Sequence, residues 1–325
     1  MNEFKDIGGI SVQEGADLFD TGHISFLGRR ICRDISTNGV DMFVVGVPFD
    51  LCATLRPGAR FGPRAIRLAS ENLSWEGKRY PWDFPLWNEL KLADSGDIMF
   101  YHESRPQMEE RLEALATQIL QKGKYLVTLG GDHYTTLPLL RAHAKKFGPV
   151  AILHFDAHTD IDDEIDRHHH GTPILHALEE GWIDVERSVQ VGIRTEFNPQ
   201  THPLAVVDAS WCNTQGPDKV AEVIHRTVRK GPVYVTFDID ALDPAYAPGT
   251  GTPAVGGLST DFVLKLLRRL VGLDMVGLDM MEVSPPYDHS EITALAAATI
   301  VTELLHVWTA TQKGYAIPKP EYRDL

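Results

Sequence analysis

The predicted fold is arranged around the segment Ala151-Ile-Leu-His-Phe-Asp-Ala-His-Thr-Asp160. Its apolar first half, with Val150 before it, is typical of a strand that is buried in a parallel sheet. The second half carries Asp156, His158 and Asp160 at alternate positions. Alternate residues of an extended chain share one face, so these three side chains can converge on one point. The segment is therefore either a strand followed by an acidic, solvated loop, or part of a metal site.

Two other apolar segments end in polar side chains in the same way. Tyr125–Leu129 runs into Gly130-Gly-Asp-His133, and Val233–Phe237 runs into Asp238-Ile-Asp240. Because ligands of an open parallel sheet collect beyond the carboxyl ends of its strands, we expect all these side chains to meet at one edge. The candidate metal ligands are His133, Asp156, His158, Asp160, Asp238 and Asp240.

Six candidate ligands are too many for one ion and suit two. Carboxylates can bridge two cations that lie roughly 3.5 Å apart. A set of oxygen donors with imidazole favours Mn²⁺-like ions over Zn²⁺, which readily takes thiolates. In the alternative, Asp238 and Asp240 are strand-end caps or part of a buried ion pair, but two carboxylates against a hydrophobic run need unusual compensation. The residues therefore predict a binuclear metal site.

Eight short apolar segments with strand character predict the sheet. They are Met42–Val47, Leu90–Ala93, Tyr125–Leu129, Val150–Phe155, Val189–Ile193, Leu204–Val207, Val233–Ile239 and Met275–Val283. Helical patterns lie between several of them, which predicts an α/β protein with an open parallel sheet and helices on both faces. A TIM barrel requires a helix after every strand, and residues 194–203 are too few and too broken by proline to supply one.

The chain is predicted to hold one large domain, residues 41–325, after an N-terminal extension of residues 1–40, because no repeat or linker divides it. One helix is expected to start with Thr260 or Asp261 as its cap. The last helix is expected to run from Ser290 towards Trp308.

Composition narrows the class of protein. With 43% hydrophobic and 23% charged residues, the 325-residue chain is typical of a soluble globular protein. Its net charge of −14 argues against a nucleic-acid or anionic-membrane partner, since both bind basic patches. The three scattered cysteines predict neither a disulfide framework nor a thiolate zinc site. Neither a signal peptide nor a membrane-spanning run is recognised, so a cytoplasmic enzyme is expected.

Several motifs together resemble the ureohydrolase family of arginases and agmatinases, and most of all the bacterial agmatinases. They are Gly130-Gly-Asp-His133, Asp156-Ala-His-Thr-Asp160, Phe237-Asp-Ile-Asp-Ala-Leu-Asp-Pro244, Glu282-Val-Ser-Pro-Pro286 and Ser290-Glu-Ile-Thr-Ala-Leu-Ala-Ala-Ala298. The resemblance covers roughly residues 40–312. It implies a three-layer α/β fold with a central eight-stranded parallel sheet and two Mn²⁺ ions. It also implies that a hydroxide bridging the ions attacks a guanidinium carbon and that urea and an amine are released.

The resemblance also implies a role for each site residue. One ion would be held by His133, Asp156, Asp160 and Asp238, and the other by Asp156, His158, Asp238 and Asp240, with Asp156 and Asp238 bridging. Asp160 is thereby both a ligand and part of the catalytic set. His170 matches the histidine that passes a proton to the leaving amine. Glu282 matches the carboxylate that accepts hydrogen bonds from the guanidinium N–H groups.

Two segments that depart from the family pattern indicate which substrate to expect. Asp162, Asp163 and Glu164 lie in the loop that faces the substrate tail in relatives. Three acidic groups would repel a carboxylate tail and attract an ammonium, which favours agmatine, cleaved to putrescine and urea, over arginine or guanidinobutyrate. Leu55 stands where the family commonly has a small residue, and a narrowed pocket would suit guanidine or a biguanide, with Ni²⁺ in place of Mn²⁺.

Other classes of function remain open. A non-catalytic partner subunit could keep the fold, although the intact set of six ligands argues against it. A zinc deacetylase of the related fold would use one ion and leave His133, Asp240 and Glu282 without a role. The family resemblance implies a homo-oligomer, a trimer or a hexamer.

Overall fold

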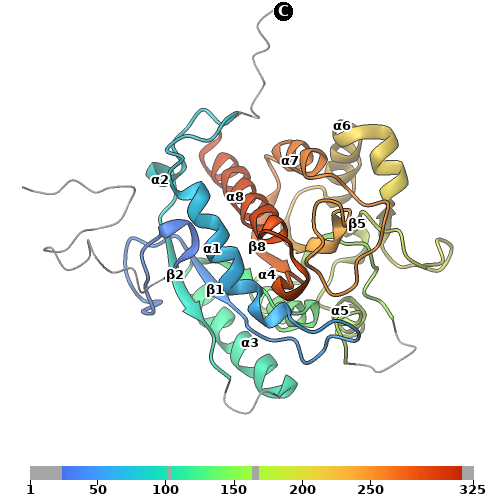
Figure 1. The fold of residues 1–325 in the computed structure, drawn as a ribbon, viewed down its shortest axis with the longest axis horizontal. Coiled ribbons are helices and arrows are strands. Elements are labelled where there is room, and N and C mark those ends of the chain that lie inside the picture. Colours follow the sequence, from blue (N-terminus) through green and yellow to red (C-terminus); the bar gives the residue numbers. More distant parts are fainter. Residues whose placement is uncertain (1–23, 101–103, 163–167, 317–325) are drawn as a thin grey trace, which may run out of the picture.

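The computed structural model describes residues 24–100, 104–162 and 168–316, which build a single eight-stranded parallel sheet with helices around it (Figure 1). The strands are β1 (Met42–Gly46), β2 (Leu92–Asp97), β3 (Tyr125–Leu129), β4 (Ala151–Phe155), β5 (Val189–Val191), β6 (Ala205–Val207), β7 (Pro232–Asp238) and β8 (Asp274–Met281). All eight predicted strands are confirmed, with ends that differ by a few residues. The predicted open α/β sheet is confirmed as well.

The strand order is β2-β1-β3-β8-β7-β4-β5-β6. After β3 the chain skips two positions to form β4, and the last two strands, β7 and β8, later fill that gap. The four central neighbours are therefore β3, β8, β7 and β4, and their carboxyl ends lie side by side. Predicted metal ligands follow β3 and β4 and lie at the end of β7, and Glu282 follows β8. The topology thus gathers segments that are distant in sequence.

Helices cover both faces of the sheet, as the alternation within one strand shows. Ala151, Leu153 and Phe155 of β4 belong to one hydrophobic cluster, and Ile152, between Ala151 and Leu153, belongs to the other. The first cluster includes residues of α1 (Gly62–Ser74), α2 (Leu86–Glu89), α6 (Ala209–Val228), α7 (Thr260–Arg268) and α8 (Ile292–Lys313). The second includes residues of α3 (Arg105–Gln121), α4 (Thr136–Phe147) and α5 (Pro173–Glu179). Burial on both faces explains why the strands are continuous apolar runs.

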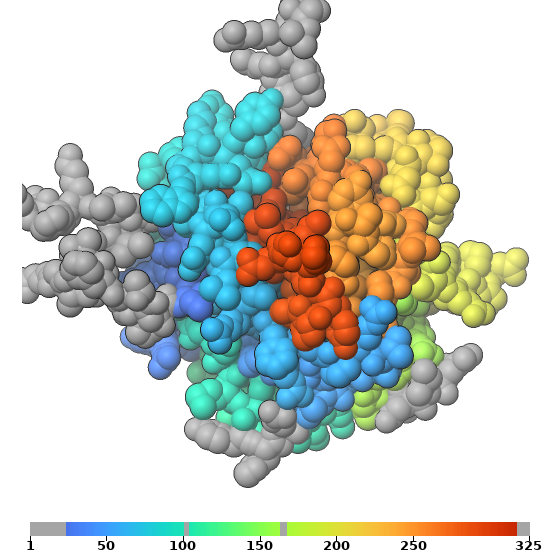
Figure 2. All heavy atoms as spheres, in the orientation of Figure 1, coloured from blue at the N-terminus to red at the C-terminus, as the bar shows by residue number. Residues whose placement is uncertain are grey.

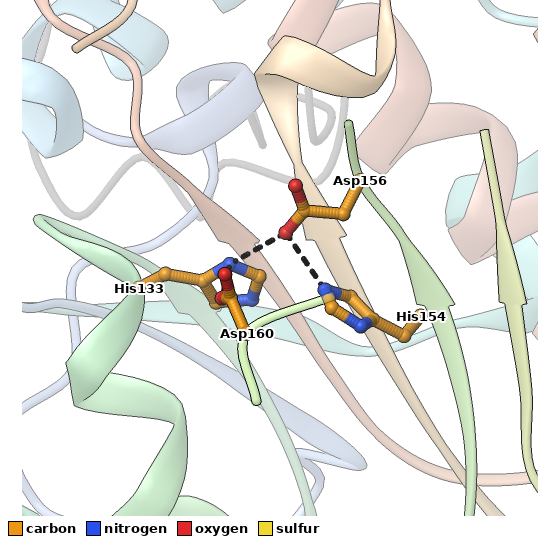
Figure 3. A group of neighbouring side chains, drawn as sticks. All are labelled: His133, His154, Asp156 and Asp160. Carbon is orange, nitrogen blue, oxygen red and sulfur yellow. Dashed lines mark hydrogen bonds and ion pairs between the residues drawn. The ribbon is translucent and has the colours of Figure 1, made fainter. Parts of the chain in front are cut away.

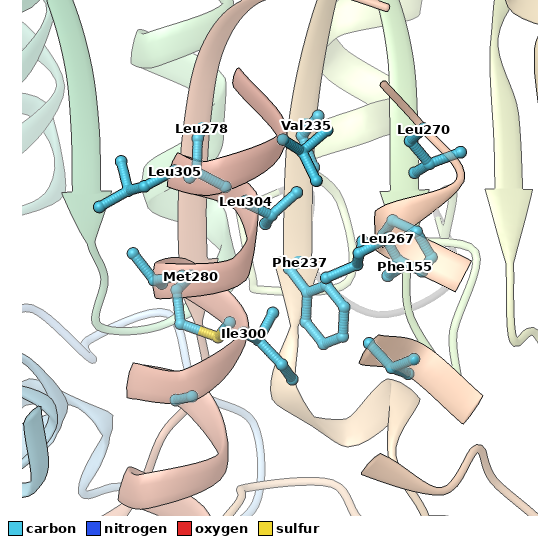
Figure 4. Packing of buried hydrophobic residues seen from close by; sticks show 14 of the residues in the cluster. Phe155, Val235, Phe237, Leu267, Leu270, Leu278, Met280, Ile300, Leu304 and Leu305 are labelled. Atoms are coloured by element: carbon cyan, nitrogen blue, oxygen red, sulfur yellow. The ribbon is translucent and has the colours of Figure 1, made fainter. Parts of the chain in front are cut away.

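Helix α8 forms the centre of the larger cluster. Its Ile300 and Leu304 face the sheet beside Phe155 and Phe237, whose rings stack with centroids 4.9 Å apart (Figure 4). It is long and apolar enough to cross a membrane, but 83% of its most apolar window is buried inside the domain. The apolar character of α8 is therefore that of a core helix. Helices α1 and α8 pack against each other and both reach the surface on one face (Figure 2).

Two predicted helix starts are wrong. The cap of α7 is Ser259, whose Oγ accepts from the amide of Phe262 at 3.0 Å, and neither Thr260 nor Asp261 caps it. The last helix begins at Ile292 because Ser290 and Glu291 have φ of 51° and 58°, in the left-handed region. A right-handed helix cannot include two such residues.

The described part of the predicted N-terminal extension, residues 24–40, packs on the body. Phe26 and Leu27 are buried in the larger cluster. The amide of Phe26 donates to Asp94 Oδ2 at 2.7 Å, and the same carboxylate pairs with Arg67. These contacts join the end of the extension to α1 and β2, while residues 1–23 lie outside the described part.

Candidate metal centre

The structure brings all six predicted ligands to the carboxyl edge of the central strands. His133 opens the short 3-10 turn after β3, and the loop after β4 carries three of the ligands. Asp238 ends β7, and Asp240 lies in the turn that follows it. Five of the six side chains are buried, and only His158 is partly exposed.

The first group of ligand atoms surrounds the ring of His133. Its Nδ1 lies 3.1 Å from Asp156 Oδ2 and 3.0 Å from Asp160 Oδ2 (Figure 3). Asp238 Oδ2 lies 3.1 Å from the same nitrogen. Neither this nitrogen nor Asp160 Oδ2 has a hydrogen-bond partner among the described residues. One imidazole nitrogen and three carboxylate oxygens thus lie together, as potential ligand atoms of one metal ion.

The second group lies on the other side of Asp156. His158 Nδ1 is 3.1 Å from Asp240 Oδ2 and 3.3 Å from Asp156 Oδ1. Asp156 therefore presents Oδ2 to the first group and Oδ1 to the second. Asp238 Oδ1 accepts the amide of Asp240 at 2.8 Å, which leaves Oδ2 as its atom towards the centre.

These separations fit two bound cations. Adjacent ligands of an octahedral ion with bonds of about 2.1 Å lie about 3.0 Å apart, as the donors around His133 do. The electrostatics agree: burial and the negative charges of Asp240 and Asp156 raise the pKa of Asp238 well above its ordinary value. The cluster is thus short of positive charge, which bound cations would supply.

Strained backbone accompanies two of the predicted site residues. Asp160 has φ of 54° and Glu282 has φ of 64°, values that side chains with a Cβ rarely adopt. Close packing also explains Gly131, where an added Cβ would lie 1.7 Å from the carbonyl oxygen of Phe49. Such strain clusters at functional sites, where the surrounding structure holds side chains in set positions.

The two predicted catalytic residues beside the ligands form a pair. His170 Nδ1 lies 2.9 Å from Glu282 Oε1, and His170 Nε2 lies 2.8 Å from Thr54 Oγ1. Glu282 Oε1 also accepts the amide of His133 at 2.8 Å, which ties the pair to the first group. Burial alone lowers the pKa of His170, but the charge and hydrogen bond of Glu282 outweigh it and raise the pKa to about 9. His170 is therefore protonated at neutral pH.

His154 was not predicted from the sequence, and its Nε2 lies 2.8 Å from Asp156 Oδ2. Gln190 determines which of its nitrogens carries the proton. Gln190 Nε2 lies 2.7 Å from the carbonyl oxygen of Thr159, which only accepts, so the amide NH₂ must face it. The same NH₂ donates to His154 Nδ1 at 2.8 Å. His154 therefore carries its proton on Nε2 and donates to Asp156, although its position among the carboxylates would also suit a metal ligand.

The signal for His154 was present in the sequence. It precedes Asp156 by two residues, so it continues the alternation of Asp156, His158 and Asp160 on the same face of the strand. Gln190 gave no signal, because it lies within an apolar run on β5.

A cavity of about 550 Å³ opens over the centre. His158, Asp160, His170 and Asp238 form part of its wall, and Asp162 and Glu196 lie among the residues that line it. Thr54 also lines the cavity, whereas Leu55 is 71% exposed and is not among the described lining residues. Glu282 is buried behind His170. Asp163 and Glu164 lie outside the described residues.

The residues of this centre lie in a region that known proteins share. The model of the arginase family matches residues 40–306. An agmatinase of Edwardsiella ictaluri is 51% identical over 270 residues, which cover 83% of this chain and 88% of the relative. The crystal structure of a hypothetical agmatinase from Burkholderia thailandensis is 45% identical, with a TM-score of 0.86 over 91% of this chain and 93% of that one. The proclavaminate amidino hydrolase from Streptomyces clavuligerus is 38% identical, with a TM-score of 0.82 over 89% and 98%.

Proposed function

The chain belongs to the arginase family, and on that premise we propose that it is an agmatinase: it cleaves the guanidinium C–N bond of agmatine and releases putrescine and urea. The observation that carries the proposal is the convergence of three carboxylate oxygens on His133 Nδ1, each within 3.1 Å, inside a family that depends on a binuclear metal centre.

We assign the ligands of two ions. The first would be held by His133, Asp156, Asp160 and Asp238, and the second by Asp156, His158, Asp238 and Asp240. Asp156 and Asp238 would be shared by the two ions. A set of carboxylates and imidazoles without thiolate suits Mn²⁺, with Ni²⁺ as the alternative.

The bound ion pair supplies a nucleophile from water at neutral pH. His170 lines the cavity, and its Nε2 lies 2.8 Å from Thr54 Oγ1. In its protonated form His170 would give the proton of Nε2 to the leaving amine. Glu282 Oε1 accepts a hydrogen bond from the N–H at Nδ1 of His170 and so orients the imidazole ring. When substrate enters, the Glu282 carboxylate is the planar acceptor that suits guanidinium N–H groups.

The cavity wall supports a substrate with a second positive charge. Asp162 and Glu196 are among the residues that line it, and acidic groups there would attract the ammonium end of agmatine. The same groups would repel the carboxylate of arginine or guanidinobutyrate.

The experiment is a substrate panel. Urea release is measured from agmatine, guanidinobutyrate, guanidine and dimethylbiguanide, with Mn²⁺ and with Ni²⁺ in separate assays. We expect agmatine with Mn²⁺ to give the highest kcat/KM, and Asp156→Ala or His158→Ala to abolish urea release. A preference for guanidine or the biguanide would keep the chemistry and overturn the substrate. A metal-loaded protein inactive on all four would overturn the function.

We also propose a cytoplasmic homo-oligomer, a trimer or a hexamer. The three cysteines, Cys32, Cys52 and Cys212, are free and buried, which suits a reducing compartment. Cell fractionation and sedimentation velocity test the location and the assembly.

A further inference from the structure

A buried carboxylate lies next to the metal centre without touching it. Asp279 of β8 has no exposed surface, although it lies in a run of apolar residues. Three hydroxyl groups point at it: Thr136 Oγ1 at 2.9 Å and Tyr234 OH at 2.8 Å from Oδ2, and Thr236 Oγ1 at 2.6 Å from Oδ1. Burying a carboxylate is costly, so three hydroxyl groups arranged around one indicate a specific role.

The strand pairing explains why these groups meet. Thr236 of β7 is the register partner of Asp279 in β8, so both side chains leave the sheet on the same face. His133 follows β3 on the other side of β8. Its Nε2 lies 2.8 Å from Thr236 Oγ1. A continuous hydrogen-bonded chain therefore runs from Asp279 through Thr236 to the ring of His133.

The direction of these hydrogen bonds follows from the number of hydrogens that each group can donate. An ionised carboxylate only accepts, and a threonine hydroxyl has a single hydrogen to donate. Thr236 gives that hydrogen to Asp279 Oδ1, so its oxygen accepts a proton from His133 Nε2. The ring of His133 then has its lone pair on Nδ1. This is the atom that faces Asp156, Asp160 and Asp238 within 3.1 Å.

We propose that Asp279 and Thr236 are positioning residues that fix His133 in the tautomer able to bind the first ion. The inference rests on the metal centre of the proposed function and adds residues outside its ligand set. Partners behind a metal-binding histidine fix the tautomer and orientation of its ring, and their loss typically weakens metal binding about 10–100-fold.

Two substitutions break the chain at different points. Thr236→Val keeps the shape but removes the acceptor for His133 Nε2–H. Asp279→Asn can place its NH₂ against Thr236 Oγ1, so that the hydroxyl turns to donate to His133 Nε2 and the ring proton moves to Nδ1. Both variants should lose affinity for the first ion and keep affinity for the second, because His158 and Asp240 take no part in the hydrogen bonds from Asp279 to His133.

Two matched variants separate this role from a general loss of packing. Thr236→Ser retains the hydroxyl and should bind both ions with the wild-type dissociation constants. Tyr234→Phe removes one buried donor to Asp279 Oδ2 but leaves the bond between Thr236 and His133, so it should lower the melting temperature and leave ion binding unchanged.

The test is Mn²⁺ titration of ion-free wild type and the four variants by calorimetry, with melting temperatures of the ion-free proteins beside it. We expect one of the two dissociation constants to rise about 10–100-fold in Thr236→Val and Asp279→Asn. If Thr236→Val melts lower but binds both ions as the wild type does, the chain is merely structural and the inference is overturned. If the wild type itself binds no ions, it is the proposed function that fails.

Discussion

The bond between His170 Nδ1 and Glu282 Oε1 sets the pH range of the proposed reaction. Proton transfer to the leaving amine needs His170 in its protonated form, and the pKa of about 9 keeps it so at neutral pH. Activity should therefore fall as pH rises through the pKa of His170. Because the charge of Glu282 raises this pKa, Glu282→Gln should lower it and start the alkaline decline at a lower pH.

This first prediction is checked by the pH profile of kcat for wild type and Glu282→Gln. We expect a lower kcat in the variant and an alkaline limb displaced towards neutral pH. His170→Asn is the control, since it removes the titrating group and should abolish that limb. An alkaline limb at the same pH in wild type and Glu282→Gln would assign it to another group.

A second prediction concerns Gln190, which holds His154 as a donor to Asp156. Gln190→Met keeps the volume but removes the N–H that binds His154 Nδ1. The ring is then free to move its proton, and metal affinity should fall about tenfold or more. His202→Ala is the matched control: His202 lies against Gln190 Oε1 at 2.6 Å, on the side away from His154. Titration with Mn²⁺ measures both, and equal affinity in wild type and Gln190→Met would contradict the role.

At this scale the sequence predicted which candidate ligands would lie together and little of what surrounds them. Asp156, His158 and Asp160 could be recognised because the two-residue period of a strand puts them on one face. Asp279 could not, because its partners come from β7 and the start of α4. Only the strand order brings those hydroxyl groups to it. The role of Leu55 stays a prediction: neighbouring Thr54 lines the cavity, whereas Leu55 is mostly exposed and is not among the described lining residues.

At the scale of elements, the start of α7 offers a third prediction. Ser259 Oγ caps the helix by accepting the amide of Phe262. Ser259→Ala should lower the free energy of unfolding by about 1 kcal/mol, the usual loss when an N-cap is removed. Thr260→Ala and Asp261→Ala should change it by less than about 0.5 kcal/mol, because neither side chain caps the helix. Urea unfolding of the three variants checks this, and a larger effect at Thr260 than at Ser259 would contradict the assignment.

The elements themselves were largely predictable, and their order was not. Apolar runs such as Tyr125–Leu129 predict buried strands because both faces of the sheet are covered by helices. The insertion of β7 and β8 between β3 and β4 leaves no local mark in the sequence, since it depends on pairing between strands that are distant in the chain. The starts of α7 and α8 were misplaced because their caps depend on backbone angles as well as on residue type.

At the scale of the whole molecule, the stability of the domain should depend on whether the carboxylates of the centre hold metal ions. In the ion-free protein, burial and the charges of Asp240 and Asp156 hold the pKa of Asp238 well above its usual value. At Asp238 the folded state then binds more protons than the unfolded state, so the contribution of this group to the stability of the ion-free protein is lost as pH rises above the ordinary carboxyl pKa of about 3.9. Bound cations offset this loss of stability. A ligand whose free concentration is 100 times its dissociation constant raises the free energy of unfolding by about 2.7 kcal/mol.

Asp238→Asn separates these two effects. Without ions, the variant should melt above the wild type at pH 7, because its side chain is neutral at every pH, whereas buried Asp238 must hold either a proton or a charge among like charges. With saturating Mn²⁺ the order should reverse, because Asp238 is a proposed ligand of both ions and the variant gains less from binding. Thermal unfolding after chelation and after Mn²⁺ loading measures both orders. An ion-free variant that is less stable than ion-free wild type would mean that Asp238 contributes to the fold itself. If the variant is the more stable protein without ions and the less stable one with Mn²⁺, the site is held in a strained state for its metal.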